Sequence, residues 1–387
     1  TIGPALICAA AVNCCMALIQ YGGWAQELSR WVPTTPPGHA YGALRQRNQF
    51  ATLTLLGLAS LLPGVLGARP LRSMLPWAGL FVVGNAASAS RVGALGLLVF
   101  CLAPCFWPAV RTRQFAAIAA VAIVGYLLAS FGLPLLLVHL QNARPETVFD
   151  RVVSDVGCGS RRVLWSNVLD LIAMRPLWGW GWGELDYAHF MTLYDGARFC
   201  DILDNAHNLP LHIAVELGVP AAVVATLCVA ALLAKGLRRT ESQPHRLMAW
   251  LIVIFLLMHS LVEYPLWYGP FFVAMILAVG LLLQRPGDAL GQSAQKARAT
   301  LVSVAACAIA CTAFVWADYR LISQAYLPAT ARFETYRNTA ISELSPVLFK
   351  DQQSGTVRAK LDESLVAKVK AVPGVADAVG TKSSIAF

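Results

Sequence analysis

The sequence predicts an all-α polytopic membrane protein, a bundle of about nine transmembrane helices with one large helical loop. Hydrophobic residues make up 57% of the 387 residues, and charged residues only 13%. The mean hydropathy of +0.59 is too high for a soluble chain of this length. Apolar stretches of spanning length also recur along the chain, which a single buried core would not require.

The predicted spans divide the chain into segments. They cover residues 2–20, 50–67, 73–89, 92–110, 115–140, 209–234, 247–268, 270–284 and 300–317. Residues 1–140 therefore hold five spans, 141–208 a large loop, 209–317 four further spans and 318–387 a C-terminal segment. Because a span begins almost at Thr1, we expect the natural protein to have further helices before it. After Lys350 the chain becomes polar, and this stretch is either a small exported appendage or foreign to the rest of the fold.

Positive charge predicts the orientation, since Lys and Arg gather in cytoplasmic loops. Here they occupy alternate connections: Arg69, Arg72, Arg111, Arg113, Lys235, Arg238, Arg239, Arg285, Lys296 and Arg298. The opposite, exported face then receives residues 21–49, 90–91, 141–208 and 264–268 and the C-terminal tail. Membrane orientation accounts for much of the net charge of +9. No basic run with interleaved aromatic residues suggests a nucleic-acid partner.

The loop 141–208 is much longer than an ordinary connection, and long ordered loops are often functional. Short helices are predicted over Pro145–Val156 and over Arg161–Met174, the second with Ser160 as its cap. The helix dipole disfavours cations in the first turn, where Arg161 and Arg162 lie. We therefore expect an anion beside them, either a bound phosphate or lipid headgroups.

The same loop holds two further features. Cys158 and Cys200 are the cysteines predicted on the exported side, and a disulfide between them is expected in an oxidising compartment. Trp178, Trp180 and Trp182 alternate with glycines. In an extended segment the three indoles would share one side and could stack on sugar rings; the alternative is that they lie at the membrane interface.

The most informative stretch is Asp204–Asn208, where the loop meets the predicted span 209–234. Asn208 is a natural N-cap, so His207 lies beside a helix N-terminus, whose dipole favours a neutral ring. A neutral imidazole can act as a general base. Asn208, His212 and Glu216 follow at steps of four, which would place Glu216 about 12 Å along one continuous helix, facing a polar cavity.

Other polar residues are predicted at the same exported level. They are Arg45–Gln49, Ser88–Arg91, His259 with Ser260, and Glu263 with Tyr264. Cations and amides beside a histidine indicate recognition of an anion. For any one of the arginines, snorkelling to the membrane interface is the alternative.

These segments carry a family resemblance. Arg45–Phe50, Ser90–Leu95, Arg175–Gly181, Asp204–Leu209 and His259–Trp267, in this order around one large loop, resemble the O-antigen ligase and polymerase superfamily. Within it, the chain is most similar to bacterial protein O-oligosaccharyltransferases, over residues 1–350. The family has a longer C-terminal region than the polar stretch after Lys350.

The resemblance implies transfer of a preassembled glycan from undecaprenyl diphosphate to Ser or Thr of an exported protein such as pilin. The reaction would take place on the periplasmic face of the inner membrane, without a metal or other cofactor. By the same resemblance His207 is the catalytic base, and Arg47, Arg91 and one of Arg161 or Arg162 bind the diphosphate. The other polar residues predicted to bind substrate are Gln49, Asn205, Asn208, Glu263 and Tyr264.

Two kinds of alternative stay open. A lipid A core O-antigen ligase or an O-antigen polymerase would use the same chemistry on another acceptor. A polytopic transporter would use His207, His212, Glu216 and Glu263 as a proton or substrate path. The spans show no internal repeat and the polar residues gather at one face, which favours the enzyme; Glu216 is the exception.

Overall fold

The computed structural model describes residues 2–283 except 30, 68, 142, 144, 148–156 and 238–240, together with 306, 310–321, 323–324, 332 and 334–336. Every regular element in these residues is an α-helix or a 3-10 helix, as the sequence predicts. The chain divides into two compact units, Thr1–Arg285 and Pro286–Phe387. The described part of the second unit contains helical residues 310–321 and the 3-10 turn Glu334–Tyr336.

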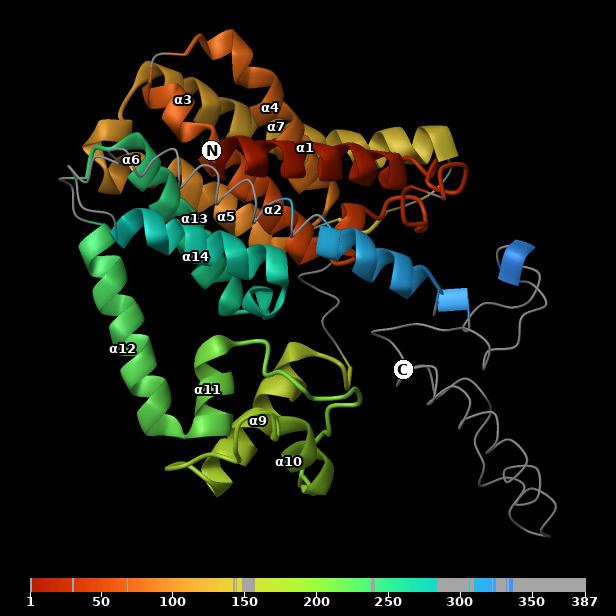
Figure 1. Cartoon of the computed structure of the whole chain (residues 1–387), viewed down its shortest axis with the longest axis vertical. Coiled ribbons are helices and arrows are strands. Elements are labelled where there is room, and N and C mark those ends of the chain that lie inside the picture. Colours follow the sequence, from red (N-terminus) through yellow and green to blue (C-terminus); the bar gives the residue numbers. More distant parts are fainter. Residues whose placement is uncertain are drawn as a thin grey trace. The chain divides into compact units, whose positions relative to one another are not determined.

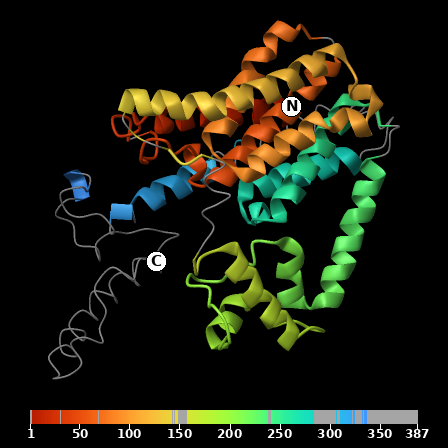
Figure 2. The ribbon, with the colours of Figure 1, turned by 180° about the vertical axis from the view of Figure 1, so that it is seen from behind.

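A helical bundle forms most of the first unit (Figures 1 and 2). Its α-helices are α1 (Ile2–Tyr21), α2 (Arg47–Ser60), α3 (Leu62–Leu66), α4 (Leu75–Ala87), α5 (Arg91–Cys101), α6 (Ala103–Phe106), α7 (Arg113–Gln141), α13 (Pro244–Ser260) and α14 (Gly269–Leu283). Short 3-10 helices lie between them: η1 (Gly42–Leu44), η2 (Leu71–Ser73), η3 (Pro108–Val110) and η4 (Pro265–Trp267). Helix α2 is central, because it packs against α1, α4, α5 and α13.

Small residues let the bundle helices approach α2 closely. A Cβ atom at Gly57 would lie 2.8 Å from Ala10, and one at Gly96 would lie 2.0 Å from Leu55. Thr52 of α2 also shares a 2.8 Å hydrogen bond with the buried His259 of α13. The end of α13 is thus fixed against the first turns of α2, which positions the candidate site.

Four helices are long and apolar enough to cross a membrane: Ile2–Tyr21, Arg47–Leu66, Arg113–His139 and Val219–Gly236. Shorter apolar helices cover Leu75–Ala87, Arg91–Phe106, Pro244–Ser260 and Gly269–Leu283. Apolar helices therefore occupy eight of the predicted spans, as expected for a membrane protein. Half of the predicted span 300–317 and most of the predicted helix Pro145–Val156 lie outside the described residues, and the count of nine stays a prediction.

The expected continuous helix over 209–234 is wrong, because the chain breaks at Gly218. Helix α11 (Leu209–Leu217) ends there and α12 (Val219–Gly236) begins. Gly218 has a φ of 91°, and a Cβ atom on it would lie 2.1 Å from the carbonyl oxygen of Leu177. Only glycine accommodates both the left-handed backbone and this approach. Glu216 therefore lies at the end of a short helix and not deep within a span.

The segment 176–181 holds this break in place through backbone hydrogen bonds. Val219 N donates to Pro176 O (2.7 Å), Trp180 N to Val215 O (2.8 Å) and Gly181 N to Glu216 O (2.9 Å). Gly179 and Gly181 have φ values of 68° and 114°, so the segment is not extended. The extended conformation that would place its three indoles on one side is therefore absent.

Residues 157–217 form a compact group that we call the loop subdomain. It contains α9 (Arg161–Met174), α10 (Leu185–Met191) and α11, which enclose an apolar core around Leu164, Val168, Leu171, Leu185 and Val215. The predicted helix 161–174 is present, and Ser160 Oγ accepts from Val163 N at its start. A disulfide joins Cys158 to Cys200 and so ties the start of α9 to the segment after α10.

Candidate active site

His207 lies in a strained turn of the loop subdomain, just before α11. Its φ of 51° is left-handed, which is uncommon for a residue with a side chain. The Asn205 carboxamide stabilises this conformation, because its Oδ1 accepts from His207 N at 2.9 Å. Asn208 caps α11 by accepting from Leu211 N (3.0 Å), and its Nδ2 donates to Leu261 O (2.9 Å). Both amides predicted to bind substrate therefore position His207 and fasten its turn to the end of α13.

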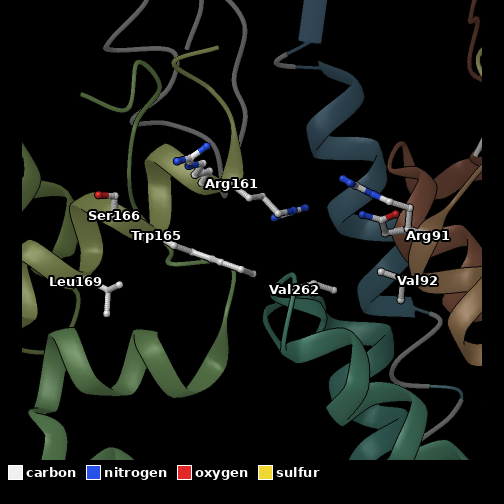
Figure 3. Close-up of a pocket in the computed structure, with 9 residues that line it drawn as sticks. Arg91, Val92, Arg161, Trp165, Ser166, Leu169 and Val262 are labelled. Atoms are coloured by element: carbon white, nitrogen blue, oxygen red, sulfur yellow. The ribbon is translucent and has the colours of Figure 1, made fainter. Parts of the chain in front are cut away.

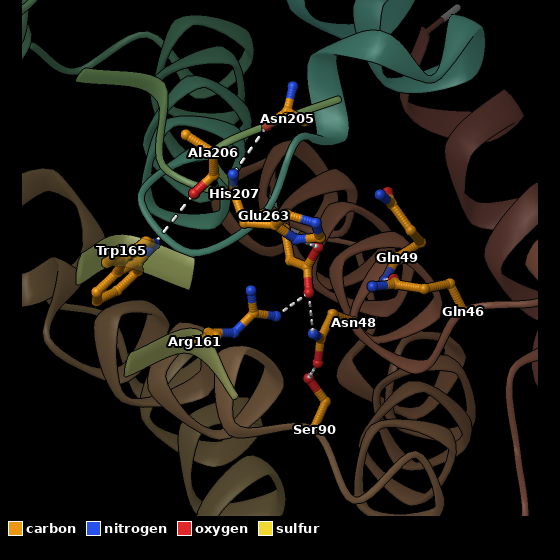
Figure 4. A network of polar contacts seen from close by, with 10 residues as sticks. All are labelled: Gln46, Asn48, Gln49, Ser90, Arg161, Trp165, Asn205, Ala206, His207 and Glu263. Carbon is orange, nitrogen blue, oxygen red and sulfur yellow. Dashed lines mark hydrogen bonds and ion pairs between the residues drawn. The ribbon is translucent and has the colours of Figure 1, made fainter. Parts of the chain in front are cut away.

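Glu263, in the turn after α13, contacts three polar side chains (Figure 4). Its Oε2 lies 2.8 Å from His207 Nδ1, and its Oε1 accepts from Asn48 Nδ2 at 3.1 Å and also from Arg161 Nη2. Ser90 Oγ in turn donates to Asn48 Oδ1 at 2.8 Å. This network joins α2, the start of α5, α9 and the His207 turn around one carboxylate.

The Glu263 side chain is only 5% exposed, so its charge depends on its partners. Burial alone would raise the pKa of Glu263, but the hydrogen bond from His207 and the positive charge of Arg161 outweigh it. Together they lower the pKa of Glu263 to about 2. The group is therefore a carboxylate at neutral pH, which can only accept hydrogen bonds.

This charge state fixes the histidine tautomer. A carboxylate at Oε2 requires a proton on His207 Nδ1, so the neutral ring has its lone pair on Nε2. No residue of the described part of the chain hydrogen-bonds Nε2, and the His207 side chain is 25% exposed. The edge of the ring packs against Tyr264 at a centroid distance of 4.7 Å. Burial raises the pKa of Tyr264, so its phenol stays protonated. The pair Glu263–His207 can accept a proton at Nε2.

A cavity of about 670 Å³ opens beside this pair (Figure 3). Arginines form its polar wall, and apolar side chains of α9, α5 and the turn after α13 form the rest. The lining residues are Asn48, Arg91, Val92, Arg161, Arg162, Trp165, Ser166, Leu169 and Val262. Guanidinium groups at such a wall can bind phosphate oxygens through paired hydrogen bonds.

Not every residue predicted to bind substrate lines the cavity. Arg91, Arg161 and Arg162 line it, whereas Arg47 does not. Arg47 instead lies 3.1 Å from Glu146 and 2.7 Å from His39 Nδ1. Gln49 is 1% exposed within the bundle and also lies apart from the cavity lining. Both residues are adjacent in sequence to Asn48, which contacts Glu263 and lines the cavity.

The three tryptophans that alternate with glycines differ in their surroundings, and none of them lines the cavity. Trp180 turns inward, donating to Leu171 O at 2.9 Å under the guanidinium of Arg175, which lies 4.1 Å from its ring. Trp178 and Trp182 are 85% and 72% exposed and do not line the cavity. The indole that does line the cavity is that of Trp165.

The predicted site residues do not include Asn48, Ser90 or Trp165, although Asn48 and Ser90 lie in polar segments that the sequence singles out. A signal for Trp165 was present, because residues 161, 165 and 169 share one face of a helix whose first turn was already singled out. Ser90 accepts from Gly93 N as the N-cap of α5, a position that its sequence context predicts. Its link to Asn48 has no local signal, since the residues are 42 positions apart.

Fold and site together define a membrane protein with a carboxylate-bound histidine beside an arginine-lined cavity. Models of three families match the chain: O-antigen ligase over residues 76–226, protein glycosylation ligase over 40–62, and the C-terminal part of the virulence factor membrane-bound polymerase over 247–368. The resemblance seen in the sequence motifs is confirmed by these matches.

Similarity to a curated protein points to the same superfamily. The chain is 25% identical over 294 residues to a general O-oligosaccharyltransferase of Acinetobacter baylyi, an alignment that covers 73% of this chain and 50% of the relative. The chain thus spans about half the length of that protein. No solved structure matches it significantly.

Proposed function

We propose that the protein transfers a preassembled oligosaccharide from undecaprenyl diphosphate to a Ser or Thr hydroxyl of an exported protein such as pilin. The observation that carries this proposal is the Glu263–His207 pair next to an arginine-lined cavity. Asn48 and Arg161 both contact Glu263 and line that cavity, together with Arg91 and Arg162. The relative from Acinetobacter baylyi and the match to protein glycosylation ligases support a protein acceptor.

The geometry supports an acid–base mechanism on the acceptor. The acceptor oxygen attacks the anomeric carbon of the sugar attached to the diphosphate, and its proton passes to His207 Nε2. A new carbon–oxygen bond forms as the bond between the anomeric carbon and the phosphate oxygen breaks, and the electron pair leaves with the diphosphate. Glu263 stabilises the imidazolium through Nδ1, as a buried carboxylate does in related dyads.

The arginines act on the other half of the reaction. Negative charge grows on the departing diphosphate, and guanidinium groups fixed in advance stabilise it. Arg161 serves both halves, because its guanidinium has five N–H donors and contacts Glu263 while lining the cavity. We place this site on the periplasmic face of the bacterial inner membrane, where a lipid-linked glycan and exported acceptors meet.

The alternatives differ in how well the chain supports them. Matches to O-antigen ligase and to a membrane-bound polymerase favour, as a second candidate, the same transfer onto lipid A core or onto a growing glycan. The transporter loses its main support, because Glu216 lies in the last turn of the short helix α11, bonded through its carbonyl to Gly181, and not deep within a continuous span.

Mass spectrometry of acceptors tests the proposal. The purified protein would be given an undecaprenyl-diphosphate oligosaccharide with a pilin-like peptide, with lipid A core, or with both. An intact oligosaccharide on Ser or Thr is the expected product. Transfer onto lipid A core alone would select the ligase, and no transfer onto any acceptor would reject the proposed function.

A further inference from the structure

The side chain of Trp165 projects from α9 into the arginine-lined cavity (Figure 3). It follows Arg161 by one helical turn, and Leu169 follows it by another, so the three side chains share one face of the helix. Arg161, whose guanidinium contacts Glu263, and the indole of Trp165 are therefore neighbours on one rigid helix. Any group bound by Arg161 lies within reach of this ring.

The indole is held in a fixed orientation. Its Nε1 donates to the carbonyl oxygen of Ala206 at 3.0 Å, and Ala206 is the residue before His207 (Figure 4). This bond uses the indole's one hydrogen-bond donor, so the remainder of the ring is an apolar surface. The side chain is half-buried against the core of the loop subdomain. Ring and histidine are thus held at a set separation by the same short piece of backbone.

The ring face is available to a ligand. Among the described residues, no aromatic ring and no cation stacks on Trp165, whereas Arg175 covers Trp180. An indole face carries negative charge density, which attracts the weakly positive C–H groups on one face of a pyranose. The cavity volume of about 670 Å³ also lies within the range of roughly 300–1,000 Å³ usual for small-molecule sites, large enough for more than a diphosphate.

We propose that Trp165 is the platform on which the first sugar of the donor stacks, the pyranose attached directly to the diphosphate. The inference rests on the proposed function and adds to it a sugar-binding residue. Arg91, Arg161 and Arg162 hold the diphosphate, so the next ring along the donor lies over Trp165, with its anomeric carbon directed to the acceptor beside His207. Sugar stacking, which the sequence left as one alternative for Trp178, Trp180 and Trp182, is thus assigned to a different indole of the loop subdomain.

Two substitutions and two ligands separate stacking from a structural role. Trp165→Leu removes both the ring and the bond to Ala206, whereas Trp165→Phe keeps a ring and removes only the bond. Affinity would be measured in lipid nanodiscs for undecaprenyl diphosphate without sugar and for the same lipid carrying the oligosaccharide. Trp182→Leu is the matched control, because its indole is exposed and outside the cavity.

Trp165→Leu should weaken binding of the glycosylated lipid roughly five- to tenfold and leave the sugar-free lipid within about twofold of wild type. Trp165→Phe should retain most of the affinity for the glycosylated lipid, and Trp182→Leu all of it. Equal losses for both lipids, a loss in Trp165→Phe as large as in Trp165→Leu, or no loss in either variant would overturn the proposal. If the wild-type protein bound neither lipid, the proposed function itself would fail, and this inference with it.

Discussion

Replacing Glu263 by glutamine removes the charge at the centre of the site while keeping the shape of the side chain. The shift of the Glu263 pKa from 4.5 to about 2 measures how strongly its partners favour the carboxylate. At about 1.4 kcal/mol per pKa unit, the site favours the carboxylate over the neutral acid by a net amount on the order of 3 kcal/mol, burial included. Arg161 and His207 are about a quarter exposed, so screening by solvent is partial.

These contacts hold the loop subdomain against the end of the bundle. We therefore expect Glu263→Gln to weaken that docking by on the order of 3 kcal/mol, roughly a hundredfold in its equilibrium constant. Hydrogen–deuterium exchange should become faster in peptides covering 161–170 and 203–209. Glu146→Gln is the control, because it removes an ion pair whose carboxylate is 58% exposed and which should contribute at most about 1 kcal/mol.

The same carboxylate predicts a pH dependence. A lowered pKa means that its contribution is complete above the ordinary value of 4.5 and is lost as the pH falls towards about 2. Protection of the loop subdomain, corrected for intrinsic exchange, should thus decline across this interval in the wild type and not in Glu263→Gln. Unchanged protection in Glu263→Gln at neutral pH would refute the role assigned to this residue.

Three further substitutions test other parts of the account. Arg91→Lys should lose most transfer activity, because an ammonium cannot reproduce the planar guanidinium fork, while Arg72→Lys, predicted on the cytoplasmic face, should keep it; comparable activity in the two would remove Arg91 from the diphosphate site. Peptide mapping without reductant should find Cys158 linked to Cys200, and Cys158→Ser should lower activity by loosening the start of α9; alkylatable thiols at both positions in protein from an oxidising compartment would contradict this. Gly218→Ala should unfold the loop subdomain at lower temperature, by proteolysis at rising temperature, since the added Cβ meets a backbone carbonyl; wild-type resistance would show that the break tolerates a side chain.

Hydropathy and capping residues in the sequence predicted the helices that depend mainly on their own residues. Runs of apolar residues located the helices of the bundle, and Ser160 marked the start of α9. The break at Gly218 was missed because hydropathy over 209–234 is continuous, although Gly218 followed by Pro220 is a local signal for a helix end. What makes the break necessary is the approach of the segment 176–181, which lies some forty residues earlier and carries no local signal.

In the candidate site too, some features have a local signal in the sequence and others depend on contacts between distant residues. His207 was identifiable from its place before a helix N-cap, but its partner Glu263 lies 56 residues away, and only the fold shows that this carboxylate contacts the ring. The family resemblance predicts Arg47 at the diphosphate, but the structure places its neighbour Asn48 at the cavity instead. Successive helical residues point in directions about 100° apart, so Arg47 reaches Glu146 while Asn48 reaches Glu263.

The central claim is that His207 accepts the proton of the acceptor hydroxyl during glycan transfer. The most direct measurement compares wild type and His207→Ala for transfer of an undecaprenyl-diphosphate oligosaccharide to a pilin-like peptide, with donor binding measured on the same samples. We predict that His207→Ala binds the donor within a few-fold of wild type, because the arginines remain, and that its transfer rate falls by roughly 10²- to 10⁴-fold. A transfer rate within a few-fold of wild type would contradict the claim.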